Sequence, residues 1–290
     1  NNTDTYTLTN TPTHYTVTKL AADTGKALAG ASLQIVKGDG TSYTAADAVD
    51  SWLSGSDGTN PDGTLAPHSL KGKLILGQTY TLMELAAPAG YLRAQPITFT
   101  FTADASVTLE NQPVRVRFAK IDNLTGAMVA GAQYAVYLDS DWQASGTAAT
   151  PVFTFTSGVT EVNRDGVLTA GAYYRLVETQ PPAGYQLNAS SIQFQAPTDQ
   201  TVLTVRMSNP RIYTFTKANA TTGAAVPGAT LRVTDLAGNT IIPAWTSGTS
   251  PYQFINSNAG GQPILKAGVD YRLVEDAAPT GYTLNTTAVV

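Results

Sequence analysis

Alternating apolar and polar residues mark short strands along this chain, and one of these strands occurs three times with a lysine at its end. The copies are residues 15–19, 116–120 and 213–217, ending in Lys19, Lys120 and Lys217. Alternate residues of a strand share a face, so each lysine lies on the apolar side. A lysine directed into a core is costly unless it is paired or chemically changed. The pattern predicts three repeats, each with a lysine facing its core.

The same succession of elements follows each lysine. A glycine turn and a small-residue segment lead into an alternating strand, and a variable region comes next. This region is longest in the first repeat, at residues 37–70, where we expect a short helix at 45–53. Late in each repeat a second strand ends in a glutamate and precedes a Pro-x-Gly-Tyr turn. These glutamates are Glu84, Glu178 and Glu275.

A closing strand ends the first two repeats, at residues 107–111 and 205–209, with an asparagine and then a proline. The third repeat stops at Val290 without such a strand, whereas residues 6–12 carry its pattern. Frequent strands and glycine turns predict an all-β fold of three tandem immunoglobulin-like β-sandwiches in a rod, the third lacking its closing strand. The expected divisions are an orphan or donor strand at 1–14, a domain with a long insertion at 15–112, and domains at 113–210 and 211–290.

Strand parity places one lysine, one glutamate and one asparagine in the core of each complete repeat. The asparagines are Asn111 and Asn209. One interpretation is a buried ion pair with a hydrogen-bonded asparagine. The other is covalent, because burial lowers the pKa of a lysine and raises that of a carboxylic acid, so that both tend toward neutrality. A neutral amine held beside an amide carbonyl that receives the acid's hydrogen bond could form a Lys–Asn isopeptide bond and release ammonia.

These residues resemble the Cna-type B domains, also called SpaA-type or prealbumin-like domains, of Gram-positive pilins and adhesins. The resemblance rests on the lysine strand, the Glu-x-x-x-Pro-x-Gly-Tyr box and the asparagine before proline. It implies self-formed bonds Lys19–Asn111 and Lys120–Asn209, catalysed by Glu84 and Glu178. In the third repeat Lys217 and Glu275 match, but no asparagine follows them.

Three explanations fit the unfinished third repeat. The chain could be a fragment, with its first residues left over from a preceding domain. Closure within one molecule is rejected for a rod, because fourteen extended residues reach only roughly 50 Å. In the third explanation, residues 6–12 of one subunit complete the third repeat of the next, and Asn10 meets Lys217 and Glu275 in a head-to-tail filament.

Composition narrows the function classes. A net charge of -4 and a pI near 5.1 give no basic patch for nucleic acid, and the absence of cysteine excludes disulfides and thiolate chemistry. No apolar run is long enough for a membrane span, and no cofactor or metal site is expected.

The sequence therefore predicts an extracellular structural protein of a cell surface or pilus, either a shaft subunit or an adhesin stalk. It is not expected to be an enzyme beyond its own single-turnover crosslinking. Its expected partners are copies of itself or flanking domains. The alternative is an adhesin that binds a host protein or glycan through the first-repeat insertion.

Overall fold

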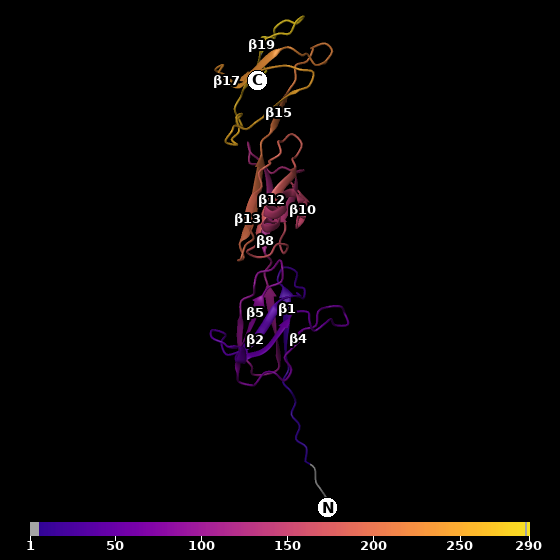
Figure 1. Ribbon diagram of the computed structural model, residues 1–290, viewed down its shortest axis with the longest axis vertical. Coiled ribbons are helices and arrows are strands. Elements are labelled where there is room, and N and C mark those ends of the chain that lie inside the picture. The colour runs from indigo at the N-terminus through magenta and orange to yellow at the C-terminus, as the bar shows by residue number, and fades with distance from the viewer. Residues whose placement is uncertain (1–5, 288) are drawn as a thin grey trace, which may run out of the picture. The chain divides into compact units, whose positions relative to one another are not determined.

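The computed structural model describes residues 6–287 and 289–290, and its regular secondary structure is almost all short β-strands (Figure 1). These strands form three repeats of two sheets each, and in every repeat one sheet carries the glutamate while the other contains the strand that leads to the lysine. The predicted all-β class and the threefold repetition are confirmed. The repeats are described one by one.

The first repeat has a four-stranded sheet of order β3-β2-β5-β6 and a three-stranded sheet of order β4-β1-β7. The strands are β1 (Tyr15–Ala21), β2 (Ser32–Lys37), β3 (Ala48–Leu53), β4 (His68–Ser69), β5 (Thr79–Ala86), β6 (Ile97–Thr100) and β7 (Ala105–Asn111). Alternate residues of β1 are buried, which places Lys19 in one row with Tyr15 and Val17. The lysine therefore points into the core, as its parity predicts.

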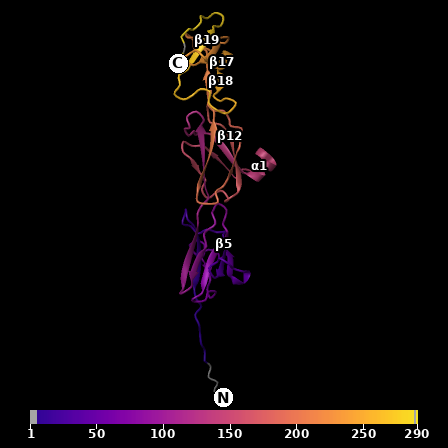
Figure 2. The same ribbon diagram turned by 90° about the vertical axis from the view of Figure 1, so that its left-hand side faces the viewer.

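The second repeat has the same two sheets, with orders β10-β9-β12-β13 and β11-β8-β14. Its strands are β8 (Arg115–Asp122), β9 (Gln133–Leu138), β10 (Phe153–Thr156), β11 (Val162–Asn163), β12 (Tyr173–Gln180), β13 (Ile192–Gln195) and β14 (Val202–Asn209). Its variable region forms helix α1 (Asp139–Ser145) and the 3-10 turn η2 (Gly146–Ala148), and α1 projects beside the sandwich in Figure 2.

The third repeat has a sheet of order β17-β16-β19 and a two-stranded sheet of β15 and β18. Its strands are β15 (Ile212–Phe215), β16 (Thr230–Thr234), β17 (Thr240–Thr246), β18 (Tyr252–Ile255) and β19 (Arg272–Ala277). Among residues 6–287 and 289–290, β15 has β18 on one side and no strand on the side where β1 has β7 and β8 has β14. The predicted lack of a closing strand is therefore present in the described part of the chain.

The closing strand β7 lies parallel to the lysine strand β1. In this register Leu109 is opposite Lys19 and Asn111 is opposite Ala21. The backbone amide of Ala22 also donates to the carbonyl of Asn111 at 2.9 Å. The pairing brings lysine and asparagine to the same end of the sandwich although they are about 90 residues apart in sequence.

The expected helix at 45–53 is wrong. Only one 3-10 turn forms, η1 (Ala45–Asp47), in a capping box where Asp47 accepts hydrogen bonds from Thr44. Residues 48–53 are strand β3 instead, with Trp52 opposite Leu33 of β2. Pairing with the edge of β2 and burial of apolar side chains here override the local helical pattern.

A buried serine fixes the small-residue segment behind each lysine strand. Its hydroxyl accepts a hydrogen bond from the amide of a fully buried alanine, in the pairs Ser54–Ala31, Ser157–Ala132 and Ser247–Ala229. The same segment donates a backbone hydrogen bond to the lysine carbonyl, from Leu28, Val129 and Val226 respectively. The serine therefore supports the strand that carries the lysine.

We expect Ser157→Ala to loosen this segment in the second repeat. The change leaves the buried Ala132 amide without its acceptor and costs about 1–3 kcal/mol of local stability. Hydrogen exchange followed by mass spectrometry should show faster exchange in peptides covering residues 129–134 of the variant than in the same peptides of the wild type. The corresponding peptides of the other two repeats are internal controls and should exchange as in the wild type. An unchanged exchange rate of the 129–134 peptides would contradict the assignment.

Candidate functional site

The first repeat buries Lys19, Glu84 and Asn111 together between its sheets. The asparagine Nδ2 donates to Glu84 Oε2 at 2.8 Å and to Oε1 at 3.1 Å. The lysine Nζ lies 4.0 Å from Glu84 Oε1 and donates to the carbonyl of Leu109 at 3.1 Å. Exposure is 5% for Lys19, 3% for Glu84 and 0% for Asn111. One carboxyl group therefore contacts both the amine and the amide.

The second repeat brings Lys120, Glu178 and Asn209 together in the same way. Lys120 Nζ lies 3.2 Å from Glu178 Oε1, with both side chains fully buried. Asn209 Nδ2 donates to the same carboxyl group at 2.6 and 2.9 Å. Two independent strand sets thus build the same triad.

The third repeat has only two of the three groups. Lys217 Nζ lies 3.0 Å from Glu275 Oε1, and the lysine side chain is 20% exposed. Within the described residues no asparagine side chain reaches this carboxyl group, and Asn10 is exposed in a segment outside any strand. The structure does not bring Asn10 to Lys217.

A backbone amide ten residues beyond each glutamate holds its second oxygen. In all three repeats this N–H donates to Oε2 at 2.6–2.7 Å, in the pairs Ala94–Glu84, Asn188–Glu178 and Asn285–Glu275. The loop after the Pro-x-Gly-Tyr turn therefore returns to the carboxyl group and fixes its orientation. Parity could not predict this contact, although the constant ten-residue spacing is visible in the sequence.

The tyrosine of each box ties that loop to the turn after the lysine strand. Tyr185 donates its hydroxyl hydrogen to Asp122 at 2.7 Å, and Arg211 also binds Asp122. In the first repeat Tyr91 donates to Asp23 at 3.4 Å, and in the third Tyr282 accepts from Asn219 at 3.1 Å. These contacts explain why the box and the turn recur together.

Burial changes the protonation of the lysines. Loss of solvation lowers the pKa of Lys19 to about 8, although Glu84 and then Glu110 oppose the change. Desolvation also lowers the pKa of Lys120, against the attraction of Glu178. Both amines are thereby moved toward the neutral, nucleophilic form.

The orientation of the asparagine differs from the sequence argument, which places the acid's hydrogen bond on the amide carbonyl. The structure turns Nδ2 of Asn111 toward Glu84, because Nδ2 also donates to the carbonyl of Leu92 at 2.7 Å. The carboxyl group therefore contacts the nitrogen that would leave as ammonia. Four buried polar atoms without a hydrogen bond belong to the three sites: Asn111 Oδ1, Lys120 Nζ, Asn209 Oδ1 and Glu275 Oε1. Two of them, Lys120 Nζ and Glu275 Oε1, belong to the Lys–Glu ion pairs, whereas the two asparagine oxygens have no partner among the described residues.

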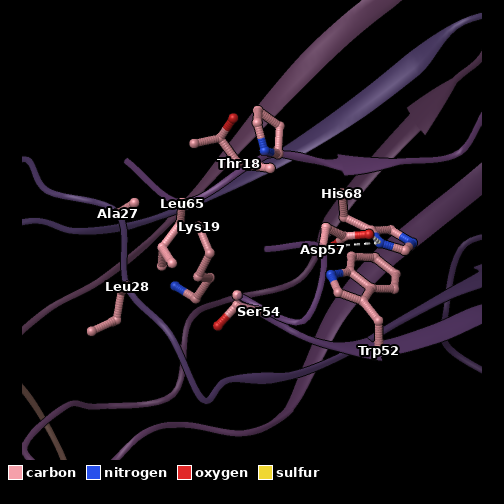
Figure 3. A pocket seen from close by; sticks show the side chains of 12 residues that line it. Thr18, Lys19, Ala27, Leu28, Trp52, Ser54, Asp57, Leu65 and His68 are labelled. Carbon is pink, nitrogen blue, oxygen red and sulfur yellow. Dashed lines mark hydrogen bonds and ion pairs between the residues drawn. The ribbon is translucent and has the colours of Figure 1, made fainter. Parts of the chain in front are cut away.

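Residues of the first-repeat insertion line a small cavity together with Lys19. His68 binds Asp57 through Nδ1 at 2.9 Å and its ring stacks on Trp52 (Figure 3). Its Nε2 binds Asp50 at 2.9 Å. The cavity between this cluster and Lys19 has a volume of about 20 Å³, which suits about one water molecule.

Comparison with known proteins identifies the family of the chain. The family model for the SpaA prealbumin-like fold domain matches residues 13–113, 114–211 and 211–290. The chain belongs to this family. The resemblance drawn from the lysine strand and the glutamate box is thereby confirmed, while the crosslinks it implies stay a prediction.

Several solved structures are similar to this SpaA-type chain. The Bacillus anthracis TIE protein is 18% identical with a TM-score of 0.37, covering 96% of this chain and 48% of that one, so the chain spans about half its length. A streptococcal ancillary pilin is 17% identical with a TM-score of 0.40, covering 96% of this chain and 94% of that one. The shaft pilin SpaA of Lactobacillus rhamnosus GG is 15% identical with a TM-score of 0.31, covering 69% of this chain and 97% of that one.

The comparison with curated protein sequences gives no match. Among the described residues, no helix is long and apolar enough to cross a membrane.

The lowered pKa of Lys19 predicts a pH-dependent stability when the amine is kept free, as in Asn111→Ala. Between about pH 8 and 10.5 the unfolded state binds the proton that the folded state has lost, so stability should rise with pH. Denaturant unfolding can be followed by Trp52 fluorescence in a Trp142→Phe, Trp245→Phe background. Adding Lys19→Met removes the titrating amine, and a rise that persists in that control would refute the assignment.

Proposed function

We propose that this chain is a structural protein of the cell surface, a pilus shaft subunit or adhesin stalk, stabilised by Lys–Asn isopeptide bonds that it forms itself. The supporting observation is the triad of lysine, carboxyl group and asparagine, which two repeats bury in the same arrangement. Membership of the SpaA prealbumin-like family supports the structural role. The proposed bonds are Lys19–Asn111 and Lys120–Asn209.

The geometry suits a proton transfer from amine to leaving group. The neutral lysine Nζ attacks Cγ of the asparagine, and the Cγ–Nδ2 bond then breaks. Glu84 or Glu178, in contact with both nitrogens, takes a proton from Nζ and gives one to Nδ2, which leaves as ammonia. Burial supplies a high effective concentration of the two reactants and excludes competing water.

Each bond would join the first and last strands of its sandwich. Since the closing strand is parallel to the lysine strand, the bond connects two strands directly, and the chain between them is not needed to carry a load. Closing a loop of about 90 residues also restricts the unfolded chain, which for a disulfide is worth about 4–5 kcal/mol. A chain without cysteine gains in this way a staple that reducing conditions do not cleave.

The proposal also includes head-to-tail joining of copies through the third repeat. Lys217 and Glu275 are paired there without an asparagine among the described residues, and a strand donated by another copy could supply it. Copies of the same chain are therefore the proposed partners, and an extended assembly follows from a contact that does not close.

Intact mass measurement tests the crosslinks. The purified monomeric chain should be lighter than its sequence mass by two ammonia molecules. Glu84→Ala and Glu178→Ala should each lose only one, because each removes the proton carrier of one repeat.

The matched control is Asp62→Ala, which removes an exposed carboxylate from a turn of the same repeat. This variant should still lose two ammonia molecules. A wild-type chain with the full sequence mass would refute the proposed bonds, provided that circular dichroism shows the β-sandwich fold.

A further inference from the structure

The open edge of β15 and the exposed residues 6–12 have complementary patterns within one chain. We propose that residues 6–12 of a second copy pair with β15 as a parallel strand in a defined register, and that Lys217 then forms an isopeptide bond with Asn10. This inference rests on the proposed function, because it assigns the same chemistry to the third site. It further specifies the partner segment, its register and the bond.

The lysine strand of the third repeat lacks the support that the other two receive. Strands β1 and β8 continue through their lysines, to Ala21 and Asp122, whereas β15 ends at Phe215, two residues before Lys217. The core beside it is also less covered. Tyr213, Phe215, Tyr271 and Leu273 are only partly buried, although their counterparts in the other repeats are mostly buried. A parallel strand on this edge would cover these apolar side chains.

The carboxyl group at the site is arranged to receive an amide. Glu275 Oε2 accepts the Asn285 amide at 2.7 Å, as the corresponding oxygens do in the complete repeats. Oε1 is buried, lies 3.0 Å from Lys217 Nζ and receives no amide hydrogen bond, whereas the same oxygen of Glu84 or Glu178 accepts one from the asparagine Nδ2. Among the described residues the third site therefore lacks the amide donor that the asparagine supplies in the complete repeats.

Residues 6–12 have the features of a closing strand. Tyr6 and Leu8 are 91% and 93% exposed, which leaves two large apolar side chains of one face uncovered. Asn10 continues that face, and Pro12 follows two residues later, as Pro113 follows Asn111.

The spacing to the next lysine strand also agrees. Lys19 comes nine residues after Asn10, and Lys120 comes nine residues after Asn111. The number of residues between the donated asparagine and the next lysine would therefore be the same as between the first and second repeats.

The register follows from the first repeat, where Leu109 is opposite Lys19 and Asn111 is opposite Ala21. Transferred to the third repeat, this register places Leu8 opposite Lys217 and Asn10 opposite Asn219. Tyr6 is then opposite Phe215, and the two aromatic residues form a cross-strand pair. A shift by one residue would turn Asn10 away from Glu275, so the apolar face enforces the register.

The reaction balances without a further reagent. Neutral Lys217 Nζ attacks Cγ of Asn10, the Cγ–Nδ2 bond breaks, and one ammonia leaves. Glu275 carries the proton from Nζ to Nδ2. The product is an amide bond between two copies.

Two variants of the 290-residue chain test the inference by complementation. Asn10→Ala keeps the acceptor Lys217 but has no donor amide, and Lys217→Ala keeps the donor strand but has no acceptor. Each alone should run as a monomer on a denaturing gel after boiling. Their mixture should give one covalent dimer and no higher species, lighter than the two chains together by one ammonia. Tandem mass spectrometry should place the link between Lys217 and Asn10.

Two further variants separate docking from chemistry. Glu275→Gln in the Asn10→Ala chain should bind the donor chain in size-exclusion chromatography but give no boiled dimer. Lys71→Ala, which removes an exposed lysine of the first repeat, should form the same covalent multimers as the wild type.

Failure of this inference can be distinguished from failure of the proposed function. If each variant has lost two ammonia molecules but the mixture gives no dimer, the inference fails while the crosslinks in the first two repeats stand. A wild-type monomer that has lost a third ammonia would show closure within one chain and overturn the inference. A dimer linked at other residues would do the same.

Discussion

The cost of placing a lysine amine inside a β-sandwich governs the organisation of this chain. An unpaired ammonium in such an interior is unfavourable by several kcal/mol, and an ion pair only partly offsets the loss of water. In the first two repeats desolvation lowers the lysine pKa, a carboxyl group lies beside the amine, and an asparagine completes the set. Other contacts near each site hold these three groups in place. The main ones come from three groups: the serine that supports the small-residue segment, the tyrosine of the box, and the backbone amide ten residues beyond the glutamate.

The three repeats form a natural comparison of the same site with and without a closing strand. Where the strand is present, the lysine is 0–3% exposed in its side chain and the lysine strand continues past it. In the third repeat the side chain is 20% exposed and the strand ends earlier. The Lys–Glu pair itself is just as short there as in the second repeat. The carboxyl group is therefore positioned by its own loop, and the closing strand contributes burial and the amide.

Much of this arrangement could be predicted from sequence because strand parity is a strict rule. Once residues 15–19, 80–84 and 107–111 are recognised as strands, Lys19, Glu84 and Asn111 must share the core face. Strand parity cannot predict the contacts that loops make. The amide of Ala94 and the hydroxyl of Ser54 belong to loops whose path depends on the whole fold, and the rotation of the Asn111 amide depends on the carbonyl of Leu92. The helix expected at 45–53 failed for a related reason, because pairing with β2 decides the conformation of that segment.

If the third site receives its asparagine from another chain, as we propose, the third repeat must stay folded beforehand while its core is partly uncovered. The third repeat meets this requirement with features that do not involve the closing strand. Trp245 stacks on Tyr252 and packs against Phe215, and Ser247 holds the segment behind Lys217. The pair of Lys217 and Glu275 can then be kept at 3.0 Å in a half-open site. The same triad would thus serve two purposes, depending only on whether the asparagine strand comes from its own repeat or from another chain: internal stapling in the first two repeats and joining of copies in the third.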